Sequence, residues 1–459
     1  MRSGLGLKAG SSVSRVLSGV LASMPLKTSI LAIRGAVPTF TRASTAMVTD
    51  FEGNTWTCLP GEARFQGMRR VQNLYTSSST LSTQSNTVVA GVYLVQFKGM
   101  GSVTLSGTGT GTINGTGTGN LVWGLVSTSA GTLTSTVSGV CTSGQLENVT
   151  NQSVQTPGEY VSTGVLSYPY QGAGVDGVQY FATKLDGTAI IGGGYLNEPA
   201  RTNLLLNSAV PATQSITATA QNYTVSFYGT GSCTLTGMAS GTLNGTGVNN
   251  RVSLTVAATA GVVLATFSGS TTNGQFENGP NMSSYIATTG TTASRAADHL
   301  EYSIPNLPQK NFTIAAEIMK PQLSTASSGA NAPVQIGSYQ SNASLVLGGY
   351  ILGSETVLGA WPTVWNLVSS ASVTPYVAGV STKSAWAFDN DGLTLRSAFS
   401  GALIAARTAN AAKTSNWSSS NIGIGSPPSG SSVSDAMPFV ISNVRLYNKA
   451  LPDAALKAL

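Results

Sequence analysis

Charged residues are scarce in this sequence. Only 9% of its 459 residues are Asp, Glu, Lys or Arg, against roughly 25% in a typical soluble protein. The net charge of +6 is spread thinly over the chain, so the clustered basic surface that binds nucleic acid is not expected. Apolar residues still make up 41% of the chain. That fraction is enough for packed cores and excludes bulk disorder.

Cysteine and histidine are nearly absent. The three cysteines, Cys58, Cys141 and Cys233, are odd in number and far apart, and His299 is the single histidine. A disulfide framework is excluded, and neither a metal site nor a cofactor is expected. His299 lies just after a repeated segment, where a lone histidine favours a structural role.

Acid–base catalysis would therefore depend on a pair of carboxylates. The nearest pairs are Asp50 with Glu52 and Asp389 with Asp391. Both pairs precede glycine, which is typical of turns, so the chain is not expected to be an enzyme. Asp389-Asn-Asp-Gly392 resembles the start of a calcium loop but lacks the later Glu of an EF-hand, and a plain Asp-Gly turn is favoured.

Long hydrophobic runs are also missing. Gly, Ser and Thr interrupt every apolar stretch, and none approaches the ~20 residues of a membrane-spanning helix. Membrane insertion is not expected.

The first 49 residues contain basic residues and no acid. Such a segment could be a transit peptide, a signal peptide or a solvated extension. We expect instead a retained arm, residues 1–45, that docks on a partner protein, because it has too few apolar residues to build its own core. The candidate anchoring residues are Arg2, Lys8, Arg15, Lys27 and Arg34.

A segment of the chain is repeated at an offset of 130 residues. Tyr93–Leu105 reappears as Tyr223–Leu235, and Gly144-Gln-Leu-Glu-Asn148 as Gly274-Gln-Phe-Glu-Asn278, without a gap in between. The first copy then has an extra stretch before Gly158-Glu-Tyr-Val161. Two copies of one domain are therefore predicted.

Within each copy, apolar and small polar residues alternate between glycine-rich breaks, which predicts half-buried antiparallel strands. Asn114-Gly115 and Asn244-Gly245 are predicted to form type I′ hairpin turns. Phosphate binding by the Gly-Thr-Gly run at 107–119 is disfavoured, because no helix-forming segment follows it. Several short strands in each copy predict a small β-sandwich of the jelly-roll type.

Several motifs resemble virion proteins of tailed bacteriophages, in particular fibre and head-spike proteins. They are Phe40-Thr-Arg-Ala-Ser-Thr45 with Glu62-Ala-Arg-Phe65, the connector-like Tyr168–Phe181 with Glu198-Pro-Ala-Arg-Thr-Asn-Leu-Leu205, and the repeat with its ending Ser294-Arg-Ala-Ala-Asp298.

The C-terminal third resembles the concanavalin A-like, laminin-G-like jelly roll. The motifs are Asn311–Ile318, Trp386-Ala-Phe388, Leu393–Gly401, Ile422-Gly-Ile-Gly425 and Phe439–Asn448. The resemblance implies a final short helix, matched by Leu451–Leu459 with Pro452 near its start. Asp391-Gly392 and Ser400-Gly401 are predicted hairpin turns.

The expected fold is all-β, with two repeated jelly rolls, a larger concanavalin A-like jelly roll and an extended N-terminal arm. The expected divisions are the arm at 1–45, a connector at 46–70, repeat 1 at 71–165, a β-rich connector at 166–200, repeat 2 at 201–298 and the C-terminal jelly roll at 299–459.

Two aromatic residues of the last domain are candidate glycan-binding residues. Trp361 and Trp365 are close in sequence and could line a groove, although packing or a subunit contact is favoured. Low charge and many apolar positions also favour a homotrimer, and a dimer or a hexamer stays open as an alternative.

The resemblance implies a structural fibre or spike on the virion, at head, neck or tail, anchored to other virion proteins through residues 1–45. Binding of host-surface polysaccharide is possible on this view. The alternative is a receptor-binding tail spike with polysaccharide-degrading activity, and a bacterial surface adhesin is a weaker one. Fold alone cannot decide among them.

Overall fold

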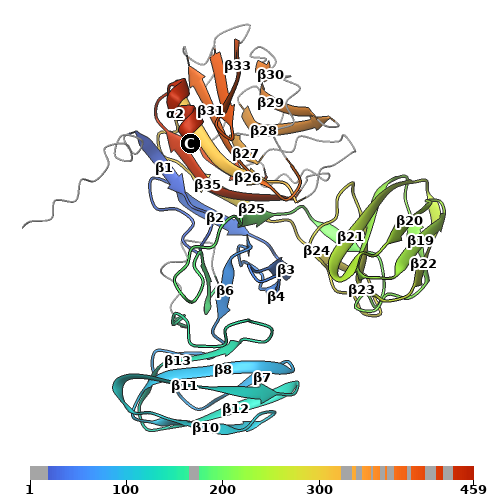
Figure 1. Cartoon of the computed structure of the whole chain (residues 1–459). Coiled ribbons are helices and arrows are strands. Elements are labelled where there is room, and N and C mark those ends of the chain that lie inside the picture. Colours follow the sequence, from blue (N-terminus) through green and yellow to red (C-terminus); the bar gives the residue numbers. More distant parts are fainter. Residues whose placement is uncertain are drawn as a thin grey trace, which may run out of the picture. The chain divides into compact units, whose positions relative to one another are not determined.

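The computed structural model shows an all-β protein whose antiparallel sheets form sandwiches (Figure 1). It describes residues 19–164, 175–321, 333–336, 344–352, 355–361, 367–369, 377–389, 394–408, 420–426 and 438–459. The chain forms two compact units. Unit 1 contains residues 19–25, 32–37 and 300–459, and unit 2 contains residues 26–31 and 38–299.

The two copies of the repeat have the same strands at the same offset, as the sequence predicts. In repeat 1 the strands are β7 (Gln84–Val88), β8 (Gly91–Gly99), β9 (Ser102–Gly107), β10 (Gly111–Asn114), β11 (Gly117–Thr128), β12 (Gly131–Ser138) and β13 (Cys141–Asn148). In repeat 2 they are β17 (Gln214–Ala218), β18 (Gln221–Gly229), β19 (Ser232–Gly237), β20 (Gly241–Asn244), β21 (Gly247–Ala258), β22 (Gly261–Ser268) and β23 (Thr271–Asn278).

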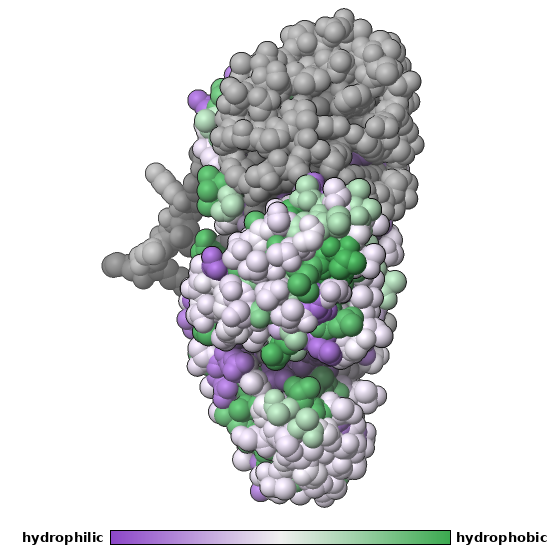
Figure 2. Space-filling model, turned by 90° about the vertical axis from the view of Figure 1, so that its right-hand side faces the viewer, coloured by the Kyte–Doolittle hydropathy of each residue, from purple (hydrophilic) through white to green (hydrophobic). Residues whose placement is uncertain are grey.

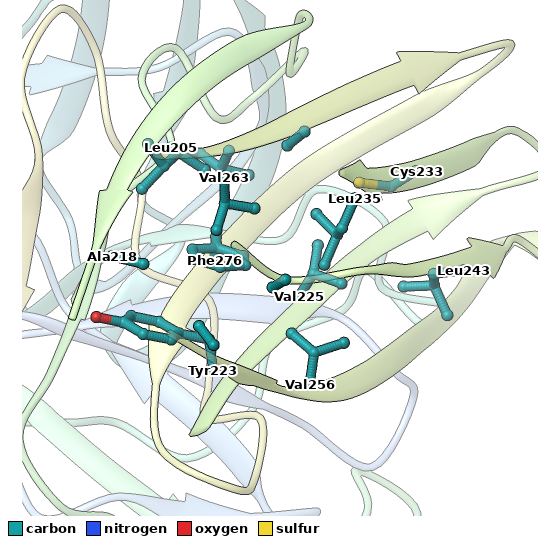
Figure 3. Packing of buried hydrophobic residues seen from close by; sticks show 14 of the residues in the cluster. Leu205, Ala218, Tyr223, Val225, Cys233, Leu235, Leu243, Val256, Val263 and Phe276 are labelled. Atoms are coloured by element: carbon teal, nitrogen blue, oxygen red, sulfur yellow. The ribbon is translucent and has the colours of Figure 1, made fainter. Parts of the chain in front are cut away.

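Each copy is a sandwich of a four-stranded and a three-stranded sheet. The orders are β10-β9-β12-β7 with β11-β8-β13, and β20-β19-β22-β17 with β21-β18-β23. In repeat 2, Leu235 and Val263 from one sheet pack with Val225 and Phe276 from the other (Figure 3). The rings of Tyr223 and Phe276 stack with their centroids 5.0 Å apart. Alternation along the strands thus produces one core per copy.

The prediction of hairpin turns at Asn114-Gly115 and Asn244-Gly245 is wrong. β10 pairs with β9 while β11 pairs with β8, so the chain passes from one sheet to the other at Asn114-Gly115. Glycine is needed there for close packing, because a Cβ on Gly115 would lie 2.2 Å from the carbonyl oxygen of Gly99. The copy at Gly245 has the same geometry, with 2.2 Å to the carbonyl oxygen of Gly229.

Short strands connect the copies within unit 2. They are β3 (Ala46–Thr49), β4 (Thr55–Cys58), β5 (Phe65–Gln66), β6 (Arg69–Gln72), β14 (Val178–Phe181), β15 (Gly194–Asn197), β16 (Arg201–Asn203) and β24 (Ala293–Arg295). They pair as β3 with β4, β5 with β15, β6 with β14 and β16 with β24. Segments far apart in sequence therefore meet in this connector.

Unit 1 is built from two antiparallel sheets. The first has the order β33 (Ala402–Thr408), β32 (Thr394–Phe399), β31 (Ser381–Asp389), β26 (Phe312–Met319) and β35 (Phe439–Tyr447). The second has the order β25 (His299–Ser303), β34 (Asn421–Ile424), β27 (Val334–Ile336), β28 (Ser344–Leu352), β29 (Glu355–Trp361) and β30 (Leu367–Ser369).

Two local predictions in unit 1 are confirmed. Ser400 and Gly401 join β32 to β33 with φ values of 45° and 83°, as a type I′ turn requires. Helix α2 (Asp453–Ala458) follows Pro452 and packs Leu456 against the first sheet. The predicted turn at Asp391-Gly392 lies outside the described residues.

The expected arm is not extended throughout. Residues Val20–Met24 form strand β1, which pairs with β35 in unit 1, and Val20, Ala22 and Met24 are buried. Their alternation with half-buried residues suits an edge strand on a packed sheet. This strand is hard to predict from the sequence because the segment is short and surrounded by Gly and Ser.

The described surface has few charged residues. Figure 2 shows one face, where most described residues have intermediate hydropathy and hydrophobic patches lie among a few hydrophilic ones. Among the described residues, no helix is long and apolar enough to cross a membrane.

Candidate functional site

The charged residues of the phage-like motifs meet in a buried ion network in unit 2. Asp298 accepts a hydrogen bond from Nη1 of Arg42 at 2.9 Å and another from Arg64. Glu198 is 2.8 Å from Nη1 of Arg64 and 2.6 Å from Nη1 of Arg295. Motifs separated by more than 200 residues thus contribute to one cluster.

This network keeps its carboxylates ionised and paired. Burial alone would raise the pKa of Glu198, but Arg295, Arg64 and hydrogen bonds from Ser284 lower it to about 2. The carboxylate therefore stays ionised at neutral pH and remains engaged with its partners. Because the partners come from the connector and from the end of repeat 2, the network fixes these two parts of unit 2 to each other.

The two repeats differ at one place just after their last strand. The offset is 130 residues at Asn148 and Asn278 but 125 at Tyr160 and Tyr285, whose hydroxyl groups bond to the equivalent Ser78 and Ser208. Repeat 1 therefore has five more residues between these points. We call residues 150–158 the insertion segment; residues 280–283 take its place in repeat 2.

The insertion segment follows a different path from its counterpart. In repeat 1, the side-chain amide of Asn54 donates to the carbonyl of Asn151 at 3.2 Å, and the backbone N–H of Ser153 donates to Glu52 at 3.2 Å. These contacts draw the segment toward the connector.

In repeat 2 the counterpart lies on its own sandwich. Arg251 donates to the carbonyl of Ser283 at 2.6 Å, and Thr255 donates to the carbonyl of Pro280 at 3.1 Å. Asn281 and Ser283 are buried there, whereas Asn151 and Ser153 are exposed in repeat 1.

The insertion segment forms one wall of a pocket of about 460 Å³. Such a volume lies within the range of small-molecule sites. We call it the connector pocket. Its lining residues are Asp50, Phe51, Glu52, Arg69, Arg70, Gln152, Ser153, Val154, Thr156, Lys184, Leu185 and Asp186.

Most charged groups of the connector pocket already have partners. Arg70 pairs with Glu62 at 2.7 Å, and Arg69 pairs with Glu159. Asp50 accepts hydrogen bonds from Nε1 of Trp56 at 2.8 Å and from two backbone N–H groups. Burial raises the pKa of Asp50, although these hydrogen bonds oppose the shift. Asp50 thus caps a turn, as the sequence indicates.

An aromatic ring and several polar side chains also line the pocket, although Gln152 bonds to Glu147 and Asp186 accepts a hydrogen bond from the backbone N–H of Thr188 at 2.8 Å. The Lys184 ammonium lies 5.9 Å from the centroid of the Phe51 ring, and Gln152, Thr156 and Asp186 also line the pocket. An aromatic face beside hydrogen-bonding groups of both signs can bind a neutral polyhydroxylated molecule. None of these residues was predicted from the sequence to bind a ligand.

Three of the seven site residues predicted from the sequence, Lys27, Arg34 and Trp361, lie among the described residues. Lys27 is half-buried in unit 2 and Arg34 is exposed in unit 1. Arg2, Lys8 and Arg15 lie outside the described residues, as does Trp365. Trp361 ends β29. These assignments stay predictions.

The remaining candidates for chemistry are the Asp389–Asp391 pair and His299. Asp389 is 2.8 Å from Nη2 of Arg396, and Asp391 lies outside the described residues. His299 is half-buried at the start of β25. In the part of the chain that the structure describes, no group of three or more His, Cys, Asp or Glu residues could hold a metal ion.

Comparison with known proteins assigns no family. No protein-family model matches the sequence, and no curated protein matches it. Among solved structures, the chain is similar to the botulinum neurotoxin type G receptor binding domain, with 14% identity and a TM-score of 0.26 over 40% of this chain and 41% of that one. A serotype D binding domain gives 12% identity and a TM-score of 0.26 over 35% and 40%.

The chain thus covers less than half the length of these toxin domains. Because TM-scores this low indicate no shared overall fold, the similarity assigns no function to the chain. The β-sandwich architecture rests on the strand order itself.

Proposed function

We propose that this chain is a fibre or spike protein of a tailed-bacteriophage virion that binds host-surface saccharide in its connector pocket. Residues 1–18 attach it to another virion protein, and its β-sandwich domains are displayed on the particle. Catalysis is not part of the proposal, because Asp50 and Glu52 are engaged in turn and loop contacts.

The observation that carries the binding role is the insertion segment. The two repeats have the same seven strands at a constant offset. Repeat 1 nevertheless has a longer segment, which bonds to its own sandwich at Thr150 and to the connector at Asn151 and Ser153, and which forms one wall of a pocket. The sandwich of repeat 2 forms without such a segment, so the fold does not require it. This difference supports a role in binding.

The chemistry of the pocket favours a neutral sugar. The Phe51 ring offers an apolar face for the C–H groups of a sugar ring. Thr156 and Lys184 offer donors, and Thr156 and Asp186 offer acceptors, for hydroxyl groups. A cavity of about 460 Å³ has room for one or two sugar rings. Arg69, Arg70 and Asp50 of the pocket are already paired within the chain, so few charged groups are left to neutralise a highly charged ligand.

Titration with oligosaccharides released from the host's surface polysaccharide tests the binding site. We expect Phe51→Ala to weaken binding about tenfold or more, since stacking on an aromatic residue contributes on the order of 1.5 kcal/mol. Exchanging the insertion segment for residues 280–283 should abolish binding, because one wall is lost. Calorimetry with the full chain measures both.

Lys98→Ala is the matched control, since Lys98 is an exposed basic residue of repeat 1 outside the pocket. It should bind as the unaltered chain does. Unchanged affinity in both pocket variants would place saccharide binding elsewhere and contradict the assignment of the pocket.

A further inference from the structure

Strand β11 of repeat 1 exposes three large apolar side chains. Leu121, Trp123 and Leu125 are 44%, 44% and 47% exposed. They alternate with Val122 and Val126, which pack into the core of the sandwich. The three therefore share the outer face of one strand. We call them the β11 stripe.

β11 is also the edge of its sheet. Among the described residues it pairs with β8 alone, in the order β11-β8-β13. Edge strands of soluble proteins are commonly protected by charged residues or proline. No Asp, Glu, Lys, Arg or Pro occurs from Gly99 to Leu146, so this edge has no such protection.

Repeat 2 shows that the sandwich does not need the stripe. At the 130-residue offset, Arg251, Ser253 and Thr255 occupy the equivalent positions. Arg251 and Thr255 bond to the carbonyls of Ser283 and Pro280, which lie over the strand. In repeat 1, Asn151 and Ser153 of the insertion segment bond to the connector instead, and the three side chains of the stripe stay 44–47% exposed.

We propose that the β11 stripe is an interface between two copies of this chain, in which β11 of one copy pairs antiparallel with β11 of the other. The pattern Leu121-x-Trp123-x-Leu125 reads the same in both directions. A twofold axis at Trp123 therefore places each Leu121 beside the partner's Leu125 and the two Trp123 side chains beside each other.

The lack of charge on β11 favours pairing with a second copy of this chain over binding of a charged partner protein. The stretch from Gly99 to Leu146, which includes β11, contains no charged residue. The exposed Lys98 pairs with Leu121 from β8, on the side of β11 away from a paired copy, so little repulsion between like copies is expected. Paired edges would also satisfy the open backbone groups of both strands. This interface goes beyond saccharide binding, because no residue of the stripe lines the connector pocket.

Native mass spectrometry of the full chain at micromolar concentration tests the interface. We expect the mass of two chains, and the mass of one chain for the triple variant Leu121→Arg, Trp123→Ser, Leu125→Thr. These replacements are the residues of repeat 2, which folds with them. Val140→Ser is the control: it also copies repeat 2, it removes an apolar residue that is 64% exposed, and it should leave two chains together.

A single-chain mass for the unaltered protein overturns the proposal. A three-chain mass, which the composition favours, overturns it as well, and so does a triple variant that keeps the mass of the unaltered chain. Far-UV circular dichroism distinguishes loss of pairing from loss of fold. If the triple variant unfolds, the crosslinking experiment described next tests the pairing instead.

Cysteine crosslinking tests the register independently. Paired antiparallel residues lie ~4.5–5.5 Å apart at Cα, within the reach of a disulfide. Trp123→Cys should therefore link to itself. Leu121→Cys should link to Leu125→Cys but not to itself, since its own copy lies roughly 13 Å along the strand. The native cysteines are buried. Absence of the Trp123→Cys dimer under oxidation overturns the pairing.

Discussion

Replacing Asp298 by alanine is expected to lower the free energy of unfolding of unit 2 by about 3–5 kcal/mol. Asp298 is 1% exposed and pairs with Arg42 and Arg64. Both guanidinium groups are fully buried, so the substitution leaves them in a low-dielectric interior with less compensation. The backbone N–H of Glu198 also loses its acceptor, at 3.0 Å.

Chemical denaturation followed by tryptophan fluorescence measures this loss, because Trp56 and Trp123 lie in unit 2. Asp186→Ala is the control: this aspartate is exposed and in the same unit, and its removal should cost about 1 kcal/mol or less. If both variants lost the same small amount, the network would not be holding unit 2 together.

If the chain is a virion protein, as proposed above, deletion of residues 2–18 should abolish its incorporation into particles while both units stay folded. The deleted segment contains Arg2, Lys8 and Arg15 and no acid, and several weak contacts acting together give strong attachment. The deletion ends before β1, which starts at Val20 and pairs with β35. A longer deletion to residue 35 would also remove β1, so loss of incorporation could then result from misfolding of unit 1 and not from loss of the attachment segment.

Complementation of a phage that lacks this protein, followed by mass spectrometry of purified particles, measures incorporation. Changing Arg2, Lys8 and Arg15 to Gln should weaken attachment less than the deletion, since exposed charges contribute modestly one by one. The exposed Lys98 and Lys310, changed to Gln, serve as controls and should not affect it. Normal incorporation of the deleted chain would place the anchor elsewhere.

The repeats show how much of the fold can be predicted from the sequence. Alternation and the 130-residue offset predict both sandwiches, and Ser400-Gly401 is a correctly predicted turn because both residues have positive φ. The predicted turn at Asn114-Gly115 was wrong for a physical reason. Its glycine is required for close approach to Gly99 and not for positive φ, a demand that arises only when the two sheets are packed together.

The motifs were recognised, but their shared role was not. Arg42, Arg64, Glu198, Arg295 and Asp298 stand out in the sequence as parts of separate motifs. Only the folded chain brings them into one network, because their contacts span the connector and the end of repeat 2. Sequence spacing carries no information on such long-range pairing.

The connector pocket was missed, although the sequence contains a signal for it. The change of offset from 130 to 125 marks an insertion in one copy of a duplicated domain, and the extra stretch before Gly158 is visible in the sequence. The other walls could not be inferred, since Phe51 and Lys184 reach the pocket from separate parts of the connector.

Binding of the purified full chain to host cells, with released surface polysaccharide as competitor, tests the proposed function most directly. The proposal predicts saturable binding that the polysaccharide displaces and that is lost when the insertion segment is exchanged for residues 280–283. Binding that persists in saturating polysaccharide, or that the exchanged chain retains in full, would contradict it.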